Sequence, residues 1–395
     1  MKLNHPLKDN ITEILGKIAD ELKFSFHNTS NTSLGLLSGD AGIALFLFYY
    51  SRFRRETDIE NLAMSYLERA VSRINKNFIH SFCDGISGLC WTVHHLINEG
   101  FLDEENKEIL EPFDSILCRA AIYELNNNNP DFLHGGTGTL CYLLNRIQVD
   151  YVFVSIEKSI EILDKKKQIE NGTYFWYYYN PLEGKLEKNI CISHGMASLL
   201  IFLSKAYKLN IKKDLIKKII DPALLYLLKQ EVDFAGVSLF PSYPKGSPKY
   251  FSYSRLGWCY GDLGIALALW HCANAFNENA LLQKALEIFN HSANRKKLQE
   301  NAIIDGGLCH GTAGLAMIFR RMYKNTNANN FCDTAGYWLE QTVKMSKFED
   351  GLAGYKSNEK DLETDVISGI SGIGLVLLTF LTDNDPVWDE SFLLT

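Results

Sequence analysis

Short turns rich in glycine and other small residues recur along the chain, and each leads into a stretch of apolar residues. Three of these stretches are Ile43–Tyr50, Leu199–Leu203 and Ile373–Leu381. Ala and Leu are frequent in such stretches and Pro is absent, which favours helices over strands. A helix that is apolar on every side is buried all round. The pattern therefore predicts a set of helices in the interior of the fold.

The segments between these stretches are apolar on one face only. Ala63, Leu67, Ala70 and Ile74 recur at helical spacing with charged residues between them, and residues 282–289 repeat the pattern. Such a pattern is typical of helices that cover a core with one side and face water with the other. Each repeat is therefore predicted to be an outer amphipathic helix, a glycine turn and an inner apolar helix.

The glycine turn occurs seven times, and successive first glycines are 46 to 66 residues apart. The seven turns are Ser38–Gly42, Asp84–Gly88, His134–Gly138, His194–Ser198, Tyr260–Gly264, His310–Gly314 and Ser368–Gly372. A spacing in this range is typical of stacked supersecondary units. Seven helix pairs can close into a ring, which predicts an all-α fold: a double-layered α/α toroid forming a single domain over residues 1–395. The turns then lie at one end, with the residue before each first glycine facing the central opening.

Two stretches depart from this rhythm. Residues 229–254 precede the fifth turn, and three prolines and several aromatic residues fall within Pro241–Ser254. We interpret residues 229–254 as a small insert or a lid. Tyr174–Tyr179 is a run of six aromatic residues. A packed strand or loop wall is favoured there over a peptide-binding surface.

Composition narrows the class of protein. The net charge is −7 and no stretch concentrates Lys and Arg, so nothing in the charge pattern favours nucleic-acid binding. The N-terminus lacks the apolar core of a signal peptide, and no run is long enough for a transmembrane segment. The nine cysteines are scattered singly rather than set in a disulfide framework. We expect a cytoplasmic protein with reduced thiols, either free or peripheral to a membrane-associated assembly.

Consecutive repeats five and six each carry a cysteine two residues before the first glycine. These are Cys259 and Cys309, and His310 follows Cys309 directly. Two thiols and an imidazole suit a zinc ion with one position left open, and such a site suits chemistry on another thiol. The alternative is two buried free thiols and a hydrogen-bonded histidine. Cys83 has the same place in repeat two, away from repeats five and six, and is predicted to pack in the core.

Four further residues near the turns are candidates for chemistry. His194 could transfer a proton beside a metal-bound ligand, or it could cap its turn. Asp131, in the preceding repeat, could orient His194 or cap a helix. Arg255 and Tyr260 flank Cys259 and could hold a carbonyl oxygen as negative charge develops there. Arg255 could equally be a surface ion-pair partner.

With these motifs the sequence resembles the LanC-like lanthionine synthetases, the lanthipeptide cyclases. The motifs are Trp258–Gly261, Cys309–Gly311, Ser193–Gly195 and the seven turns, and the resemblance covers nearly the whole chain. It implies a seven-repeat α-toroid with zinc held by Cys259, Cys309 and His310. It also implies that His194 and Asp131 are catalytic, and it matches Arg255 and Tyr260 to the family's Arg before and Tyr after the first zinc cysteine.

The implied reaction is thioether ring formation in a ribosomally made precursor peptide. Peptide Cys thiols add to dehydroalanine or dehydrobutyrine, which gives lanthionine or methyllanthionine, and the resulting enolate takes a proton from His194. The implied partners are the dehydrated peptide, a dehydratase and an exporter. The alternative is a zinc protein of the same fold that binds glutathione or a peptide without cyclising it. A prenyltransferase or a glycosidase is less favoured, because Arg255 alone makes a poor basic diphosphate pocket and the turns supply few of the facing carboxylates that a glycosidase needs.

Overall fold

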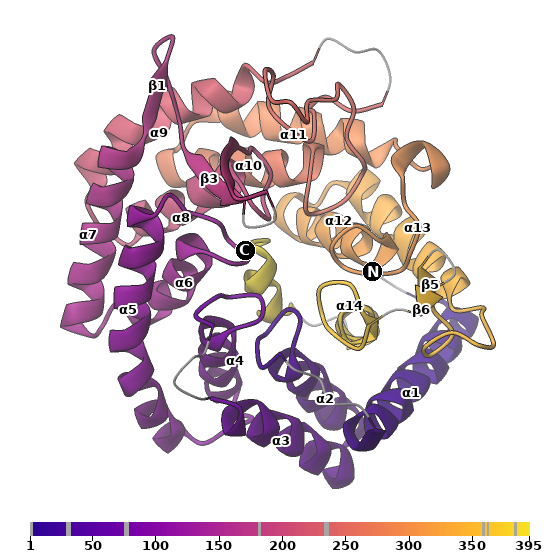
Figure 1. The fold of residues 1–395 in the computed structure, drawn as a ribbon. Helices are drawn as coiled ribbons and strands as arrows, with labels where there is room; N and C mark the ends of the chain where they lie inside the picture. The colour runs from indigo at the N-terminus through magenta and orange to yellow at the C-terminus, as the bar shows by residue number, and fades with distance from the viewer. Residues whose placement is uncertain are drawn as a thin grey trace. The chain divides into compact units, whose positions relative to one another are not determined.

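Helices dominate the computed structural model, which describes residues 3–28, 33–74, 79–180, 183–232, 237–357, 360–361, 363–382 and 385–395. Within those residues the chain forms fourteen α-helices, a few 3-10 turns and short strands (Figure 1). The helices alternate along the chain between two kinds, which differ in how much of their surface is buried. The expected repeat of one amphipathic helix, one glycine turn and one apolar helix is confirmed.

The helices that follow the glycine turns are buried on nearly every side, as predicted. In α14, for example, every residue from Ile370 to Phe380 is buried. The glycine of the turn stands directly before or within the first turn of each helix, where it leaves room for the neighbouring backbone. These helices are α2 (Asp40–Arg54), α4 (Ile86–Asn98), α6 (Gly136–Leu143), α8 (Met196–Lys208), α10 (Asp262–Phe276), α12 (Thr312–Thr326) and α14 (Ile370–Thr382).

The helices between them bury one face. In α3 the buried residues are Ala63, Tyr66, Leu67 and Ala70, which follow the predicted spacing, whereas Ile74 lies beyond the end of the helix. The amphipathic helices are α1 (His5–Asn28), α3 (Thr57–Ser72), α5 (Glu111–Asn126), α7 (Asp150–Lys166), α9 (Lys213–Leu228), α11 (Asn279–Ala293) and α13 (Asn329–Met345).

The chain divides by its internal contacts into two compact units. The first comprises Met1–Ile79, Cys83–Glu104 and Leu298–Thr395, and so holds both ends of the chain. Here α14 packs against α1 and α2, and the Ile367 N–H donates a 2.8 Å hydrogen bond to the Leu37 carbonyl (Figure 1). The last repeat therefore covers the first, as expected if the terminal repeats bury each other.

The second unit comprises His80–Phe82 and Glu105–Lys297. Its helices run from α5 to α11, with α8 packed against α9 and α10. Two antiparallel hairpins stand between α7 and α8, and the sequence pattern did not predict their strand pairing. They pair β1 (Gln168–Glu170) with β2 (Thr173–Phe175) and β3 (Tyr177–Asn180) with β4 (Lys185–Lys188). A third hairpin, in the first unit, pairs two strands of two residues each, β5 (Lys356–Ser357) and β6 (Lys360–Asp361).

The run of six aromatic residues forms β2, the start of β3 and the link between them. Phe175, Trp176 and Tyr178 are buried, and Phe175 stacks on Tyr226 of α9 with ring centroids 5.2 Å apart. The Trp176 indole N–H donates to the Leu163 carbonyl of α7 at 2.9 Å. The favoured interpretation of this run as a packed strand or loop wall is therefore confirmed.

Residues 229–254 make up most of the connection between α9 and α10, and residues 233–236 of this segment lie outside the described part of the chain. The remainder is irregular loop without a helix or strand. Lys249 forms ion pairs with Glu183 at 2.6 Å and Glu187 at 2.8 Å, which ties the loop to the β3–β4 hairpin. The interpretation of 229–254 as an insert or lid, like that of 1–395 as one domain, stays a prediction.

One backbone hydrogen bond recurs in six of the seven glycine turns. The N–H of the residue after the first glycine donates to the carbonyl of the residue six before that glycine. The pairs are Asp40–Ser33, Ile86–Ile79, Gly136–Asn129, Met196–Asn189, Thr312–Asp305 and Ile370–Glu363, at 2.9 to 3.3 Å. The fifth turn, whose residues are all described, lacks this bond, and its Gly261 has a φ of 80°. The turn that carries Cys259 therefore has its own backbone conformation.

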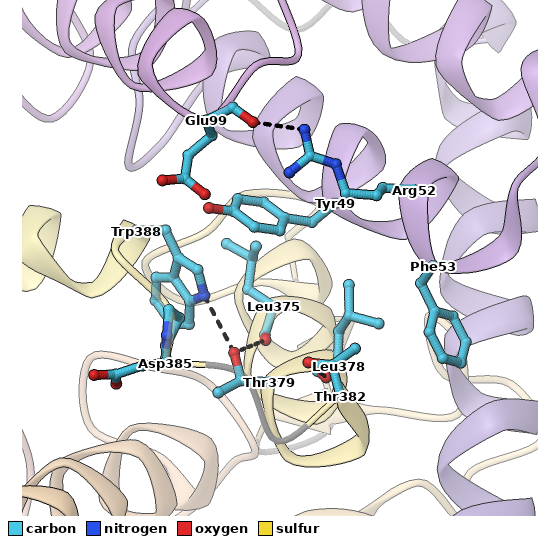
Figure 2. A pocket seen from close by; sticks show the side chains of 11 residues that line it. Tyr49, Arg52, Phe53, Glu99, Leu375, Leu378, Thr379, Thr382, Asp385 and Trp388 are labelled. Atoms are coloured by element: carbon cyan, nitrogen blue, oxygen red, sulfur yellow. Dashed lines mark hydrogen bonds between the residues drawn. The ribbon is translucent and has the colours of Figure 1, made fainter.

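A cavity of about 260 Å³ lies in the first unit, at the ends of α2 and α14 opposite their glycine turns. Figure 2 shows Arg52 donating to the Glu99 carbonyl, and Thr379 accepting from the indole N–H of Trp388. These polar groups of the wall already have partners within the unit. Among the described helices, none has the length and apolar character needed to span a bilayer.

Candidate metal centre

The two cysteines of repeats five and six are fixed through the backbone of their turns. In five places, the residue two before the first glycine of one turn donates its N–H to the carbonyl of the equivalent residue in the next turn around the repeats. In this way the Cys309 N–H donates to the Ile367 carbonyl at 2.8 Å. The Cys259 carbonyl accepts from the Ser193 N–H at 3.5 Å and from the Ser193 hydroxyl at 3.2 Å. Both thiols therefore stand on backbone that neighbouring turns hold in place.

Cys259, Cys309 and His310 form a group whose ligand atoms all lie within 4.8 Å of one another. Zinc–sulfur and zinc–nitrogen bonds of about 2.0–2.3 Å place the ligands of a tetrahedral ion roughly 3.3–3.8 Å apart. The group thus fits zinc after small movements. Cys259 is buried, while Cys309 and His310 are partly exposed, so a fourth ligand could approach from solvent. The two thiols and the imidazole predicted from the sequence thus form one group, and their use as a zinc site stays a prediction.

Asp305 was not among the residues predicted from the sequence. Its carboxylate Oδ2 lies 3.4 Å from Nε2 of His310, and its side chain is 4% exposed. Burial alone would raise the pKa of Asp305, but His310 and the N–H of Gly307 together hold it below its ordinary value. The carboxylate is therefore charged and faces the outer nitrogen of a candidate ligand. Asp305 has the same place in its turn as Arg255 has in the preceding one, six residues before the first glycine.

His194 and Asp131 form the closest contact among the remaining candidates. Nδ1 of His194 lies 2.7 Å from Oδ2 of Asp131. The other carboxylate oxygen accepts the backbone N–H of His134 at 2.8 Å, so Asp131 is held in its orientation from both sides. The His194 side chain is 32% exposed. Since Nδ1 is occupied by Asp131, Nε2 is the nitrogen available to a substrate.

The charge of His194 depends on this contact. Burial alone would lower the pKa of His194, because the imidazolium loses solvation. The Asp131 carboxylate outweighs that loss, by its charge and by the hydrogen bond, and raises the pKa above its ordinary value. The pair therefore keeps the imidazole protonated to a higher pH than an unpaired histidine would, and the protonated form is the one that can donate a proton.

The rings before the first glycine of turns three, four and five lie next to one another. His134 stacks on His194 with centroids 5.9 Å apart, and His194 and Tyr260 are separated by 6.4 Å. The Tyr260 hydroxyl lies 3.4 Å from the hydroxyl of Tyr243, which the sequence did not single out and which comes from the 237–254 loop. Burial raises the pKa of Tyr260 well above its ordinary value, so the phenol stays neutral.

The remaining two residues considered from the sequence are Arg255 and Cys83. Arg255 is half-buried and makes no hydrogen bond or ion pair through its side chain with the described residues. Cys83 is buried with its sulfur 3.7 Å from the Ser38 hydroxyl, and it is not part of the candidate ligand group, which agrees with a packing role.

Gly261 is the residue on which the conformation of the fifth turn depends. We expect Gly261→Ala to destabilise the protein by about 2–5 kcal/mol, because a positive φ strains alanine and the added Cβ needs space. An ideal Cβ would lie 2.1 Å from the Ser254 hydroxyl oxygen. Denaturant unfolding would measure the loss.

Gly246→Ala provides the matched control for Gly261. Gly246 has a φ of 84° in the same loop, but nothing lies within 4 Å of an added Cβ. It should show only the backbone cost, roughly 1 kcal/mol. Equal losses for the two variants would contradict the steric argument.

Residues 30–393 match the family model described as "Lanthionine synthetase C-like protein". The chain belongs to this family. Its curated relatives include the "Nisin biosynthesis protein NisC" of Lactococcus lactis subsp. lactis, 24% identical over 417 residues. That alignment covers 98% of this chain and 95% of the relative.

A second relative carries a different activity in its name. The "Glutathione S-transferase LANCL1" of Danio rerio is 23% identical over 338 residues, which is 81% of this chain and 76% of the relative. Membership of the lanthionine synthetase C-like family therefore does not by itself choose between ring formation and chemistry on glutathione.

The solved structure named "Nisin cyclase" superimposes on this chain with a TM-score of 0.77 and 21% identity. The match covers 99% of this chain and 98% of the other. That structure is a helical toroid, and the likeness establishes the fold. The predicted double-layered α/α toroid is confirmed.

Proposed function

We propose that this lanthionine synthetase C-like protein is a zinc-dependent cyclase that forms thioether rings in a ribosomally made peptide. The observation that carries the proposal is the group of two thiols and one imidazole, with the His194–Asp131 pair on neighbouring turns. The near end-to-end match to NisC favours the same conclusion. The substrate would be a dehydrated precursor peptide that contains cysteine.

Cys259, Cys309 and His310 would hold the zinc ion. Zinc at this site would lower the pKa of a substrate thiol that takes the open position, so that the thiol attacks as a thiolate. Two protein thiolates would offset much of the metal's charge, which keeps the attacking sulfur nucleophilic. The partly exposed side of the group supplies the access that a peptide needs.

His194 would complete the reaction as a general acid. The thiolate sulfur forms a bond to the β-carbon of the dehydro residue while the carbon–carbon double bond becomes an enolate. Nε2 of protonated His194 then donates its proton to the α-carbon. Asp131 accepts from Nδ1 throughout, fixing the ring and stabilising its charged form. The thiol's own proton passes to solvent in the first step, and a proton from solvent restores His194 after the last, so the overall reaction is an isomerisation.

Tyr260 and Arg255 would stabilise the enolate oxygen. Tyr260 is a neutral phenol next to His194, and it can donate a hydrogen bond. Arg255 carries a cation without an ion-pair partner in the described part of the chain, and it is half-buried. A donor and a cation near a developing negative charge lower the barrier most where water is excluded.

The second candidate is a zinc protein that binds glutathione or a peptide thiol without closing a ring. The relation to LANCL1 favours it, since the same ligand set activates any thiol. Under either function we place the protein in the cytoplasm. A dehydratase and an exporter remain the partners we propose for the cyclase.

Incubation of the protein with a dehydrated, cysteine-containing peptide tests the proposal. Ring closure leaves the peptide mass unchanged, so the expected result is loss of alkylation at the peptide thiol, detected by mass spectrometry. Glutathione added to the same reaction separates the candidates. A glutathione adduct on the dehydro residue, with the peptide thiol still open to alkylation, would favour the second candidate. A peptide whose thiol can still be fully alkylated and that gains no adduct, as in a reaction without protein, would contradict both candidate functions.

A further inference from the structure

His310 presents different surroundings to its two ring nitrogens. Nε2 lies 3.4 Å from Oδ2 of Asp305. A metal ion and a proton cannot share one imidazole nitrogen, so a neutral histidine ligand binds metal through one nitrogen and carries its proton on the other. A carboxylate beside Nε2 favours the proton at Nε2. Nδ1 is then the nitrogen left for the metal.

Asp305 is well fixed for such a role. Its Oδ1 accepts the Gly307 N–H at 2.9 Å, and its Oδ2 accepts the Ser357 hydroxyl at 3.3 Å. The turn closes tightly around it, because an ideal Cβ on Gly311 would lie 2.4 Å from Oδ1. The carboxylate therefore cannot swing away from His310 without losing these contacts.

We infer that Asp305 is a positioning residue for the metal centre: it holds the His310 ring with its proton on Nε2 and directs Nδ1 to the zinc ion. The inference rests on the zinc site proposed above. Outer carboxylates of this kind raise the basicity of a histidine ligand, and their loss costs about 10–100-fold in metal affinity. The function of this buried acid is thus electrostatic and orientational, beyond its part in the turn.

Zinc affinity of two substitutions at Asp305 tests the inference. Asn keeps an oxygen for the Gly307 N–H but turns an amide N–H₂ toward Nε2, whereas Ala loses both contacts. A positioning role predicts that Asp305→Asn and Asp305→Ala both weaken zinc binding about 10–100-fold in competition with a chromophoric chelator. A purely structural role through Gly307 predicts near wild-type affinity for Asp305→Asn alone, and that result would overturn the inference.

Asp365→Asn is the matched control. Asp365 is a buried carboxylate of the seventh turn whose Oδ1 accepts the Ser368 N–H at 3.0 Å, and it is not one of the candidate ligands. The zinc affinity of Asp365→Asn should stay within about twofold of wild type. This control separates a specific effect of Asp305 from a general effect of removing a turn carboxylate. If Asp365→Asn weakens zinc as much as Asp305→Asn, the positioning role is wrong.

The wild-type protein offers a test that needs no substitution. With ¹⁵N-labelled histidine, NMR of the zinc-loaded protein should show one ring that binds zinc through Nδ1 and keeps a proton on Nε2. Zinc on Nε2 would overturn the inference while leaving the metal centre intact. A wild-type protein that binds no zinc at all would instead overturn the proposed function, and this inference with it.

Discussion

Replacing Cys309 with alanine should take the zinc content of the purified protein from about one ion per chain to nearly none. A site with only three protein ligands needs all of them to hold the ion. The two ligands left, Cys259 and His310, bind zinc far more weakly than the set of three. We expect a loss well beyond the ~100-fold that changes outside the ligand set cause. Thioether formation should disappear together with the metal, since the substrate thiol then keeps its ordinary pKa. Metal analysis of the purified proteins and the thiol-alkylation assay would measure the two effects.

Cys83→Ala is the control that makes this result specific. Cys83 has the same place in the second turn as Cys309 has in the sixth, and it is likewise a thiol of a glycine turn. It lies outside the candidate ligand group, so zinc content and ring formation should both survive its loss. A Cys309→Ala protein that still binds one zinc ion per chain would show that other residues hold the metal.

The repeat architecture was accessible from the sequence because its signals are local. Glycine turns and the change between one-faced and fully apolar helices are visible within windows of about fifteen residues. The repetition of one turn then aligned Cys259 with Cys309 in consecutive repeats. Side chains that occupy equivalent places in stacked units come close together, which is why the proximity of these two thiols and His310 could be predicted.

The parts that sequence reasoning missed depend on partners distant in the chain or on irregular backbone. Strands β1 to β4 have three or four residues each, too short for an alternating pattern to identify. Tyr243 reaches Tyr260 from an irregular loop that has no periodicity. Asp305 does have a signal, since it aligns with Arg255 six residues before the first glycine. That alignment can be recognised only once the recurrent backbone hydrogen bond is known. The bond ends at the carbonyl six residues before the first glycine, which marks where each turn begins.

Replacing His194 with asparagine should slow ring closure by about 10²–10⁴-fold, the usual contribution of a positioned proton donor, while zinc content stays unchanged. His194 is not one of the grouped ligand residues, so its loss leaves the metal set complete. Asparagine can still donate a hydrogen bond to Asp131, which preserves the local packing. Rates with a dehydrated peptide, together with metal analysis of the same sample, would measure both quantities.

His134→Asn is the matched control for this substitution. His134 has the same place in the preceding turn and stacks on His194, and its backbone N–H donates to Asp131 at 2.8 Å. Its replacement should change the rate by less than about tenfold. Equal losses in the two variants would contradict a specific role for His194.

Asp131→Asn should alter the pH dependence of the same step. Asp131 raises the pKa of His194, so the wild-type ring keeps its proton to a higher pH than an unpaired histidine would. Removing the negative charge lowers that pKa. Since the proposed reaction needs the protonated ring, the fall in rate as pH rises should begin at a lower pH in Asp131→Asn. An unshifted profile would mean that the His194 proton is not the one delivered to the α-carbon, even if the substitution lowers the rate at every pH.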